Sequence, residues 1–397
     1  MPEHSYLKRT WAEISLDRLK HNFEAIRAHT PEGVKIMSVV KADAYGHGAA
    51  VVAPELEALG SDAFAVSNIE EAVVLRRNGV HASILVLGWV PAAWTDVLIR
   101  ERIETSVSSY EGAKRLSDEA VRLNGIVSVH IKADTGMGRL GLRVTDDADV
   151  CRAAEEIRRI SELPNLRIAG MFTHFATADE PGDSFSTVQF TRFDRLRRRL
   201  DELGIEHGLC HCSNSAATIL HREYACDMVR AGVTLYGLSP DNDPASALAK
   251  ACAVEPVMTL KSTIVQKRRF RCGDTVSYGA HMLTHDADIA VIPVGYADGY
   301  PRLLSGTGMV GVQGTRAKIV GKVCMDMTMI DVSGSSAAEG SEVLLFGKTG
   351  DDWIPAESVA ALAGTIGYEL VCCIGRRVTR VYLKDGKEVT AVRLTTA

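Results

Sequence analysis

Long apolar runs, basic clusters and paired cysteines are all missing from this sequence of 397 residues. No stretch of about 18 or more apolar residues is present, which excludes a membrane-spanning helix. The 45 Lys and Arg residues oppose 50 Asp and Glu residues, a formal net charge of −5. Without a basic run, the chain has no electrostatic footprint for nucleic acid or for an anionic membrane. The N-terminal residues contain no apolar segment typical of a signal peptide, so we expect a cytoplasmic protein.

Cysteine occurs nine times, but never in the CxxC spacing of a structural zinc site or in an evident disulfide framework. Two close pairs occur, Cys210 with Cys212 and Cys372 with Cys373. We therefore expect reduced thiols, most of them acting as small core hydrophobes, and no bound metal.

The first part of the chain alternates short apolar runs with helical patterns. Alternation of this kind gives parallel strands, because each crossover needs a helix. Eight such units predict a closed (β/α)8 barrel over residues 13–240. A doubly wound sheet is the alternative, but it needs a GxGxxG turn after its first strand, where this sequence has Lys41. The expected strands are 34–43, 63–67, 83–88, 104–108, 127–134, 167–174, 208–214 and 228–232.

A different pattern begins after the polar, turn-rich segment 239–247. Apolar and polar residues alternate with period two, and Gly and Asp cluster between the runs, which is typical of antiparallel strands. One helix is expected, at 355–364. We predict a mainly β second domain over residues 241–397, joined by residues 1–12.

Polar residues follow the apolar runs of the barrel region. The carboxyl ends of barrel strands and the loops after them form the active sites of such folds. Lys41 directly follows an apolar strand, so its amine is expected to be partly desolvated, which lowers a lysine pKa and favours attack on a carbonyl. A solvent-facing lysine is the alternative. The other polar residues at these ends are Tyr45, Lys132, Asp134, Arg139, His174, Asn214, Ser215 and Arg230.

The last two strand ends carry a pattern typical of phosphate binding. Asn214 and Ser215 stand at one strand-to-helix junction, and Arg230 and Gly232 stand at the next. Backbone N–H groups at such junctions bind phosphate, although simple helix capping is a compatible interpretation. A phosphate site beside a nucleophilic lysine is an arrangement for pyridoxal phosphate.

Eight motifs stand in order over about residues 36 to 380, namely VVKADAYGHG, IKADTGMGRLG, MFTHFATADE, CSNSAAT, VRAGVTLYGL, VSYGA, VGYADGYPR and VCMDMTMIDV. Together they resemble the motifs of the alanine racemases, which are fold-type III pyridoxal-phosphate enzymes. The resemblance implies racemisation of L- and D-alanine, with D-alanine supplied for peptidoglycan, by a homodimer with shared active sites.

The resemblance also implies roles for individual residues. Lys41 matches the lysine that holds the cofactor and acts as one base, and Tyr278 matches the second base, supplied by the partner subunit. Arg230 matches the arginine that faces the pyridine nitrogen, and His174 links that arginine to the tyrosine. Arg139 matches a residue at the cofactor and the substrate carboxylate, and Lys132 matches a lysine that is often carbamylated; pairing with Asp134 is the alternative for Lys132.

Other matched positions bind the cofactor or the substrate. The cofactor set is completed by Tyr45, Asn214, Ser215, Gly232 and Tyr368, and Met325 and Asp326 match partner residues at the substrate carboxylate. Asp298 and Tyr300 resemble a channel motif, for which a structural turn is an equally good interpretation.

The sequence departs from the family pattern at Gly367, where Asn is expected, and at Thr379, where Pro is expected. These departures leave a broad-spectrum or serine racemase open as an alternative. A pyridoxal-phosphate decarboxylase is a further alternative, but it needs an acidic partner for the pyridine nitrogen where this chain has Arg230. A non-catalytic carrier of the cofactor is the last alternative. Such a protein would lack the β domain and Tyr278, both of which are expected in this chain.

Overall fold

A computed structural model describes residues 6–180 and 182–393, which divide into two compact units. The barrel unit comprises residues 23–44 and 49–235, and the β unit comprises 1–22, 45–48 and 236–397. Residues 1–5 and 394–397, which belong to the second predicted domain, lie outside the described residues.

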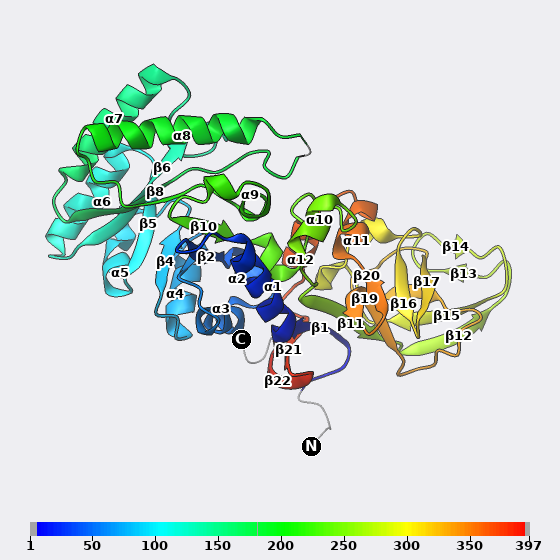
Figure 1. Cartoon of the computed structure of the whole chain (residues 1–397). Helices are drawn as coiled ribbons and strands as arrows, with labels where there is room; N and C mark the ends of the chain where they lie inside the picture. The colour runs from blue at the N-terminus through cyan, green and yellow to red at the C-terminus, as the bar shows by residue number, and fades with distance from the viewer. Residues whose placement is uncertain (1–5, 181, 394–397) are drawn as a thin grey trace. The chain divides into compact units, whose positions relative to one another are not determined.

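The barrel unit is built on eight parallel strands, as the alternating pattern predicted (Figure 1). The two end strands of the hydrogen-bonded path are joined by Asp227 N–H to Cys210 O (3.0 Å) and Arg230 N–H to Ser213 O (2.9 Å), so the ring is nearly closed. The predicted (β/α)8 barrel is therefore confirmed. The path runs β10 (Met228–Ala231), β2 (Lys35–Val39), β3 (Ala63–Val66), β4 (Ser83–Val86), β5 (Ile103–Val107), β6 (Val127–Asp134), β8 (Leu166–Phe172) and β9 (Leu209–His211), with the short β7 (Leu142–Arg143) beside β6.

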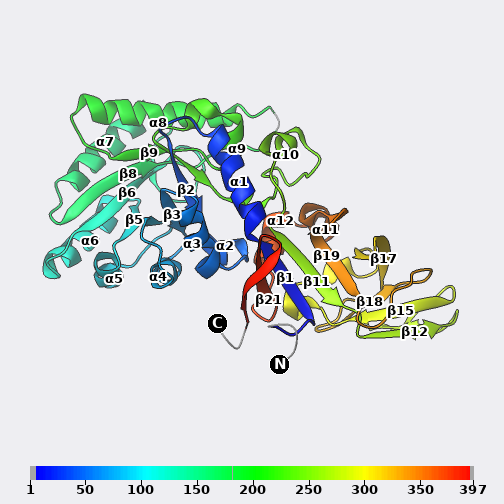
Figure 2. The same ribbon diagram turned by 60° about the horizontal axis from the view of Figure 1, so that its bottom comes forward.

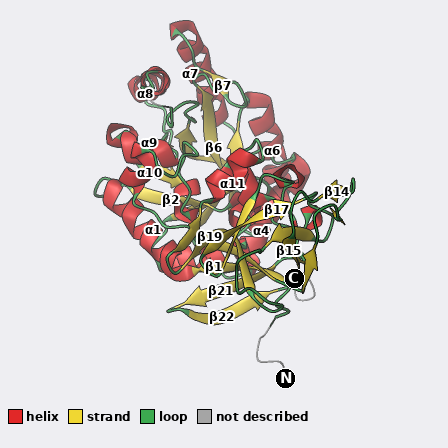
Figure 3. Cartoon of the chain, turned by 90° about the vertical axis from the view of Figure 1, so that its right-hand side faces the viewer, coloured by secondary structure: helices red, strands yellow, loops and turns green. Residues whose placement is uncertain are grey.

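Helices surround these strands on the outside (Figures 1 and 3). Their starts are set by local sequence: Asn68, Ser109 and Asp146 each accept a hydrogen bond from the first turn of the helix that follows. Ser15 likewise accepts from Arg18 N–H at 3.2 Å. The helices are α1 (Leu16–His29, with residues in both units), α3 (Ala49–Ala58), α4 (Ile69–Arg77), α5 (Thr95–Arg100), α6 (Tyr110–Arg122), α7 (Asp147–Ser161), α8 (Phe185–Glu202) and α9 (Ser215–Leu220).

The β unit holds a large, mainly antiparallel sheet, as the period-two pattern predicted (Figure 2). Its path is β12 (Gln266–Phe270), β15 (Ala287–Ile292), β18 (Thr328–Asp331), β17 (Thr315–Val320), β16 (Met309–Val312), β19 (Glu342–Thr349), β11 (Met258–Thr263), β1 (Thr10–Ser15), β21 (Thr379–Lys384) and β22 (Lys387–Val392), with β20 (Asp352–Ile354) on β19 and a separate hairpin of β13 (Thr275–Val276) and β14 (His281–Met282).

The predicted single helix of this region is α11 (Ala356–Leu362), but α10 (Ala247–Cys252) and α12 (Gly367–Cys372) are present as well. Both are one-and-a-half-turn helices, too short for an amphipathic period to show in the sequence. Throughout the described part of the chain, no helix combines the length and the apolar character needed to cross a bilayer.

Candidate active site

Lys41 lies just beyond β2 and begins a left-handed turn, α2 (Lys41–Tyr45). Ala42, Asp43 and Ala44 all have φ of 53–55°, a conformation that costs roughly 1–2 kcal/mol for each residue with a side chain. Two hydrogen bonds to carboxylates hold this turn in place. A Glu71 carboxylate oxygen accepts from Ala42 N–H at 2.7 Å, and Asp43 Oδ1 accepts from Ala49 N–H at 2.7 Å. Such strain clusters at functional sites, and here it fixes the chain that carries Lys41.

Arg230, on β10, is buried within the barrel unit, only 3% exposed. Its Nη2 donates to the carbonyl oxygens of Thr173 (2.8 Å) and Cys212 (2.9 Å), and its Nη1 donates to the carbonyl oxygen of His211 (2.7 Å). Among residues 6–180 and 182–393, the Nε–H group of Arg230 has no hydrogen-bond partner. No carboxylate within these residues forms an ion pair with the Arg230 guanidinium. Burial lowers the pKa of Arg230 to about 10, so it remains a charged donor at neutral pH.

Two histidines flank the Arg230 guanidinium. Nδ1 of His174 lies 3.3 Å from Nη2, and Nδ1 of His211 lies 3.0 Å from Nη1. The pKa of each imidazole lies well below its usual value, because of burial first and then the charge of Arg230. The predicted contact of His174 with Arg230 is therefore present, whereas His211 was not predicted from sequence.

Positive charge gathers around His174. Arg230, Arg139, Lys41 and Lys132 all lower its pKa, so these four predicted residues lie within electrostatic reach of one imidazole. The neutral imidazole of His174, with four cationic side chains around it, is suited to a ligand that carries phosphate and carboxylate groups.

Lys132 is a buried lysine on β6, 8% exposed, with its ammonium 5.4 Å from the centre of the Phe172 ring. Burial, followed by the charges of Arg139 and Arg230, lowers the pKa of Lys132 to about 8. Asp134 does not form an ion pair with Lys132 among the described residues; its Oδ1 instead accepts from the N–H groups of Gly136 and Gly138, both at 3.0 Å. The alternative that Lys132 pairs with Asp134 is thus not supported. Arg139, which follows this turn, is exposed.

The two predicted phosphate-binding junctions meet. Ser215 Oγ accepts from Gly232 N–H (2.9 Å) and from Thr234 Oγ1–H (3.1 Å), which leaves its own hydroxyl hydrogen for a ligand. Asn214 caps α9 by accepting from Ala217 N–H at 3.0 Å. The capping interpretation therefore holds for Asn214, while Ser215 keeps a donor.

Tyr45 and Tyr368 both belong to the β unit, where their ring centroids lie 6.3 Å apart. Tyr45 stacks on Tyr236, and the Tyr368 hydroxyl donates to Pro240 O at 3.1 Å. Gly46 has a φ of 78°, and a Cβ there would lie 2.2 Å from the carbonyl oxygen of Val371. Close packing within the β unit therefore accounts for the glycine at this position of the YGHG motif.

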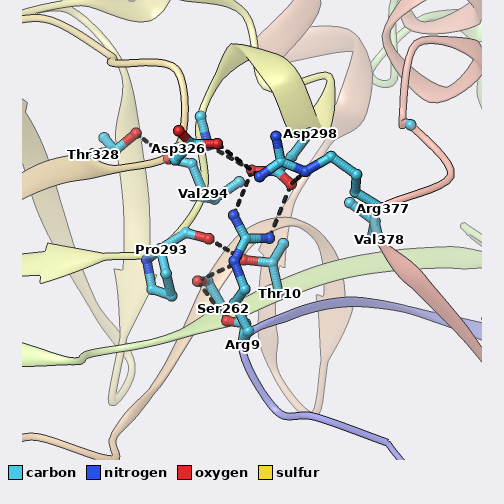
Figure 4. A network of polar contacts seen from close by, with 12 residues as sticks. Arg9, Thr10, Ser262, Pro293, Val294, Asp298, Asp326, Thr328, Arg377 and Val378 are labelled. Atoms are coloured by element: carbon cyan, nitrogen blue, oxygen red, sulfur yellow. Dashed lines mark hydrogen bonds and ion pairs between the residues drawn. The ribbon is translucent and has the colours of Figure 1, made fainter. Parts of the chain in front are cut away.

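Three predicted site residues lie on the surface of the β unit. Tyr278 is 73% exposed, Met325 is 52% exposed, and Asp326 accepts from Arg377 Nη2 at 2.7 Å (Figure 4). Asp298 is buried and accepts from Arg9 and from the Gly295 N–H, which supports the structural-turn interpretation of the GYADGY motif. No cluster of metal-binding side chains occurs among the described residues.

Comparisons with known proteins agree with this geometry. The alanine racemase N-terminal domain matches residues 14–240, and the alanine racemase C-terminal domain matches residues 257–382. The chain is 38% identical to alanine racemase 1 of Clostridium acetobutylicum, over 98% of each chain, and 41% identical to the alanine racemase of Clostridium tetani, over 97% and 98%.

Solved structures are similar over nearly the whole chain. The alanine racemase of Clostridium difficile 630 has a TM-score of 0.91 at 37% identity, covering 98% of this chain and 99% of its own. That of Bacillus anthracis with bound L-Ala-P has a TM-score of 0.89 at 34% identity, covering 99% of both. That of Bartonella henselae with covalently bound pyridoxal phosphate has a TM-score of 0.82 at 26% identity, covering 94% and 99%.

Proposed function

Since this chain belongs to the alanine racemase family, we propose that it interconverts L- and D-alanine with pyridoxal phosphate, as a cytoplasmic homodimer that supplies D-alanine for peptidoglycan. The observation that carries this proposal is the cationic group of Lys41, Arg139, Lys132 and Arg230 around a neutral His174. All nine cysteines are free thiols, which suits a reducing compartment.

The donors of the barrel unit fit this cofactor. Arg230 offers a buried Nε–H to a ring nitrogen, and Ser215 offers a hydroxyl hydrogen to phosphate. Tyr45, Asn214, Gly232 and Tyr368 complete the proposed cofactor set. When bound through Lys41, pyridoxal phosphate supplies the electron-withdrawing ring that makes the α-proton of an amino acid acidic.

Arg230 limits how strongly that ring withdraws electrons. A guanidinium with a pKa of about 10 donates a hydrogen bond at neutral pH without giving up its proton. Such a donor would leave the ring nitrogen of a bound cofactor unprotonated, which would favour racemisation over transamination.

Two bases on opposite faces of the substrate divide the proton transfers in this proposal. Lys41 acts on one face, and Tyr278 of the partner subunit acts on the other. Because Arg230 can only donate, the Nδ1 atom of His174 accepts, and its hydrogen is on Nε2. That N–H can donate to a phenolate oxygen and so help a tyrosine to act as a base.

The substrate carboxylate is assigned to Arg139, with Met325 and Asp326 of the partner subunit completing the pocket. A carbamylated Lys132 would be an anion that orients Arg139. Its lowered pKa supports this, because only the neutral amine attacks carbon dioxide.

The test is reconstitution of the purified chain with pyridoxal phosphate and a screen of L-amino acids for loss of optical rotation. We expect turnover of alanine and, after borohydride reduction, cofactor attached to the Lys41 peptide. Equal or faster turnover of serine would favour the broad-spectrum alternative. Absence of racemisation, or cofactor attached elsewhere, would overturn the proposal.

Shared active sites are tested by mixing Lys41→Ala and Tyr278→Phe chains, each inactive by itself. Some heterodimers then carry one intact site, so activity should return. If the chains exchange and no activity returns, the proposed partner role of Tyr278 is wrong.

A further inference from the structure

A line of four polar side chains crosses the interior of the barrel unit, from strand β5 to strand β10. Glu104 Oε2 lies 3.0 Å from His130 Nε2, His130 Nδ1 lies 2.9 Å from His211 Nε2, and His211 Nδ1 lies 3.0 Å from Arg230 Nη1. The two histidines are 2% and 0% exposed. Buried polar groups of this kind are costly unless every one of them is hydrogen-bonded, and here each imidazole nitrogen has a partner.

Only one arrangement of hydrogens satisfies this line. Arg230 has donors and no acceptor, so His211 Nδ1 must accept and the His211 hydrogen lies on Nε2. That N–H donates to His130 Nδ1, so the His130 hydrogen also lies on Nε2 and donates to the Glu104 carboxylate. A second proton on His130 would set two N–H groups against each other, so both rings are neutral.

Glu104 is the anion at the end of this line, and Arg230 is the cation at its other end. Burial would raise the pKa of Glu104, but hydrogen bonds from His130 and Ser83 and the charge of Arg167 hold it below its usual value. Its side chain is 18% exposed, and it lines a cavity of about 490 Å³ together with Arg102 and Arg167. The cavity lies among the first residues of β4, β5, β6 and β8, the end of the barrel strands opposite to Lys41.

We infer that Glu104 is a positioning residue for Arg230, which acts through the fixed tautomers of His130 and His211. The inference rests on the proposed role of Arg230 at the cofactor. This line of four side chains, here called the relay, holds Nη1 together with the His211 carbonyl oxygen. The carbonyl oxygens of Thr173 and Cys212 hold Nη2, which leaves Nε–H as the donor proposed for the ligand. Stacking of His211 on Phe172, at 5.0 Å and 4° between the ring planes, keeps the second imidazole in the same orientation.

Loss of the Glu104 acceptor removes the constraint on His130. If His130 changes tautomer, its Nδ1–H faces the Nε2–H of His211, and relief of that conflict moves the His211 hydrogen to Nδ1, against Arg230 Nη1. Two donors would then face each other beside the proposed cofactor nitrogen. Because a misplacement of about 1 Å near a reacting group can cost about 100-fold in rate, the change should appear in kcat.

The test uses the full-length chain with nitrogen-15 in its histidine rings. In the unmodified cofactor-free protein, His130 and His211 should both show the neutral Nε2–H pattern of ring shifts between about pH 6 and pH 8. Detection of an Nδ1–H or doubly protonated ring at either position overturns the inference, whatever the activity of the enzyme. This readout also separates failure of the inference from failure of the proposed racemase function.

Variants then test the coupling to Arg230. Glu104→Leu removes the acceptor and should disturb both ring patterns and lower kcat roughly 10- to 100-fold with little change in KM for alanine. Glu104→Gln keeps an acceptor oxygen and should retain the ring patterns and most of kcat. Glu57→Leu is the matched control, since Glu57 accepts from His81 and Ala82 N–H groups near the same cavity but does not contact the relay. An unchanged ring pattern in folded Glu104→Leu, or equal losses of kcat in the two Leu variants, would contradict the coupling.

Discussion

The Arg9 guanidinium donates to both carboxylate oxygens of Asp298, at 2.9 and 3.1 Å, although 289 residues separate the two along the chain (Figure 4). Asp298 also contacts Arg377 Nε at 3.4 Å, and Arg377 in turn holds Asp326. The Asp298 side chain is only 1% exposed, so one buried carboxylate ties the start of the chain to the proposed substrate-pocket segment of the β unit.

Asp298→Asn should therefore destabilise the protein. Removing one partner of a buried ion pair costs about 3–5 kcal/mol, and we expect about 2–3 kcal/mol because Arg9 and Arg377 keep access to water. Urea unfolding measures this loss. Asp118→Asn, which breaks the exposed pair with Lys114, is the control and should cause no measurable change. Equal losses in the free energy of unfolding for the two variants would show that the Asp298 ion pairs stabilise the protein no more than an exposed pair does.

Glu71→Ala should weaken the left-handed turn after Lys41. The Glu71 carboxylate accepts from Ala42 N–H at 2.7 Å and from Ser67 N–H at 2.8 Å, so the variant should lose about 1–3 kcal/mol of stability and part of kcat. Glu70→Ala, on the exposed side of the same helix turn, is the control. Adding Ala42→Gly should restore part of the loss, because glycine adopts positive φ without strain. Thermal unfolding that does not distinguish Glu71→Ala from Glu70→Ala would refute this role.

Acid should destabilise the protein through His211. Its pKa in the folded state is well below the usual 6.5, because of burial and the Arg230 charge, so the unfolded chain takes up a proton that the folded chain refuses. The stabilising contribution is present above pH 6.5 and is lost as the pH falls below that value, on the order of 1 kcal/mol between pH 7.5 and 5.5. The free energy of unfolding of His211→Gln should depend less steeply on pH than that of the unmodified protein. Parallel slopes for the two proteins would be inconsistent with a neutral His211.

Lys132 should take up carbon dioxide. Its amine has a pKa of about 8, so the reactive neutral form increases as pH rises from 7 to 9. With carbon-13 bicarbonate, the protein should show a carbamate signal that grows over this range and is absent in Lys132→Arg. The same variant should raise KM for alanine roughly tenfold, equivalent to one hydrogen bond of about 1.4 kcal/mol at Arg139. A carbamate signal that persists in Lys132→Arg would assign the modification to another lysine.

The positions of strands and strand ends were predictable because they follow from local pattern. Eight apolar runs gave the barrel, and Lys41, Arg230, His174 and Lys132 stand at or near their carboxyl ends. Spacing in the sequence is enough to place such residues, since parallel strands bring their ends to one face.

Other features depend on contacts that no local pattern contains. His130 and His211 lie inside apolar runs, where a core histidine and a relay histidine look the same in sequence. Ala42 and Ala44 have no preference for positive φ, so the left-handed turn depends on the contacts of Glu71 and Asp43. Residues 45–48 follow a barrel strand in sequence but pack in the β unit, because Gly46 and Gly48 fit only against Val371 and Tyr382.

The narrow seam between β9 and β10 has a consequence for local opening of the barrel. These are three- and four-residue strands, joined by the backbone bonds Asp227 to Cys210 and Arg230 to Ser213 rather than by a full ladder. A seam with so few backbone bonds is where a closed ring opens first, and its amide hydrogens exchange through local rather than global unfolding. Ser215 and Gly232 follow the two strands of this seam. A ligand that binds both residues would therefore link the two strands, and its binding free energy would add to the free energy needed to open the ring.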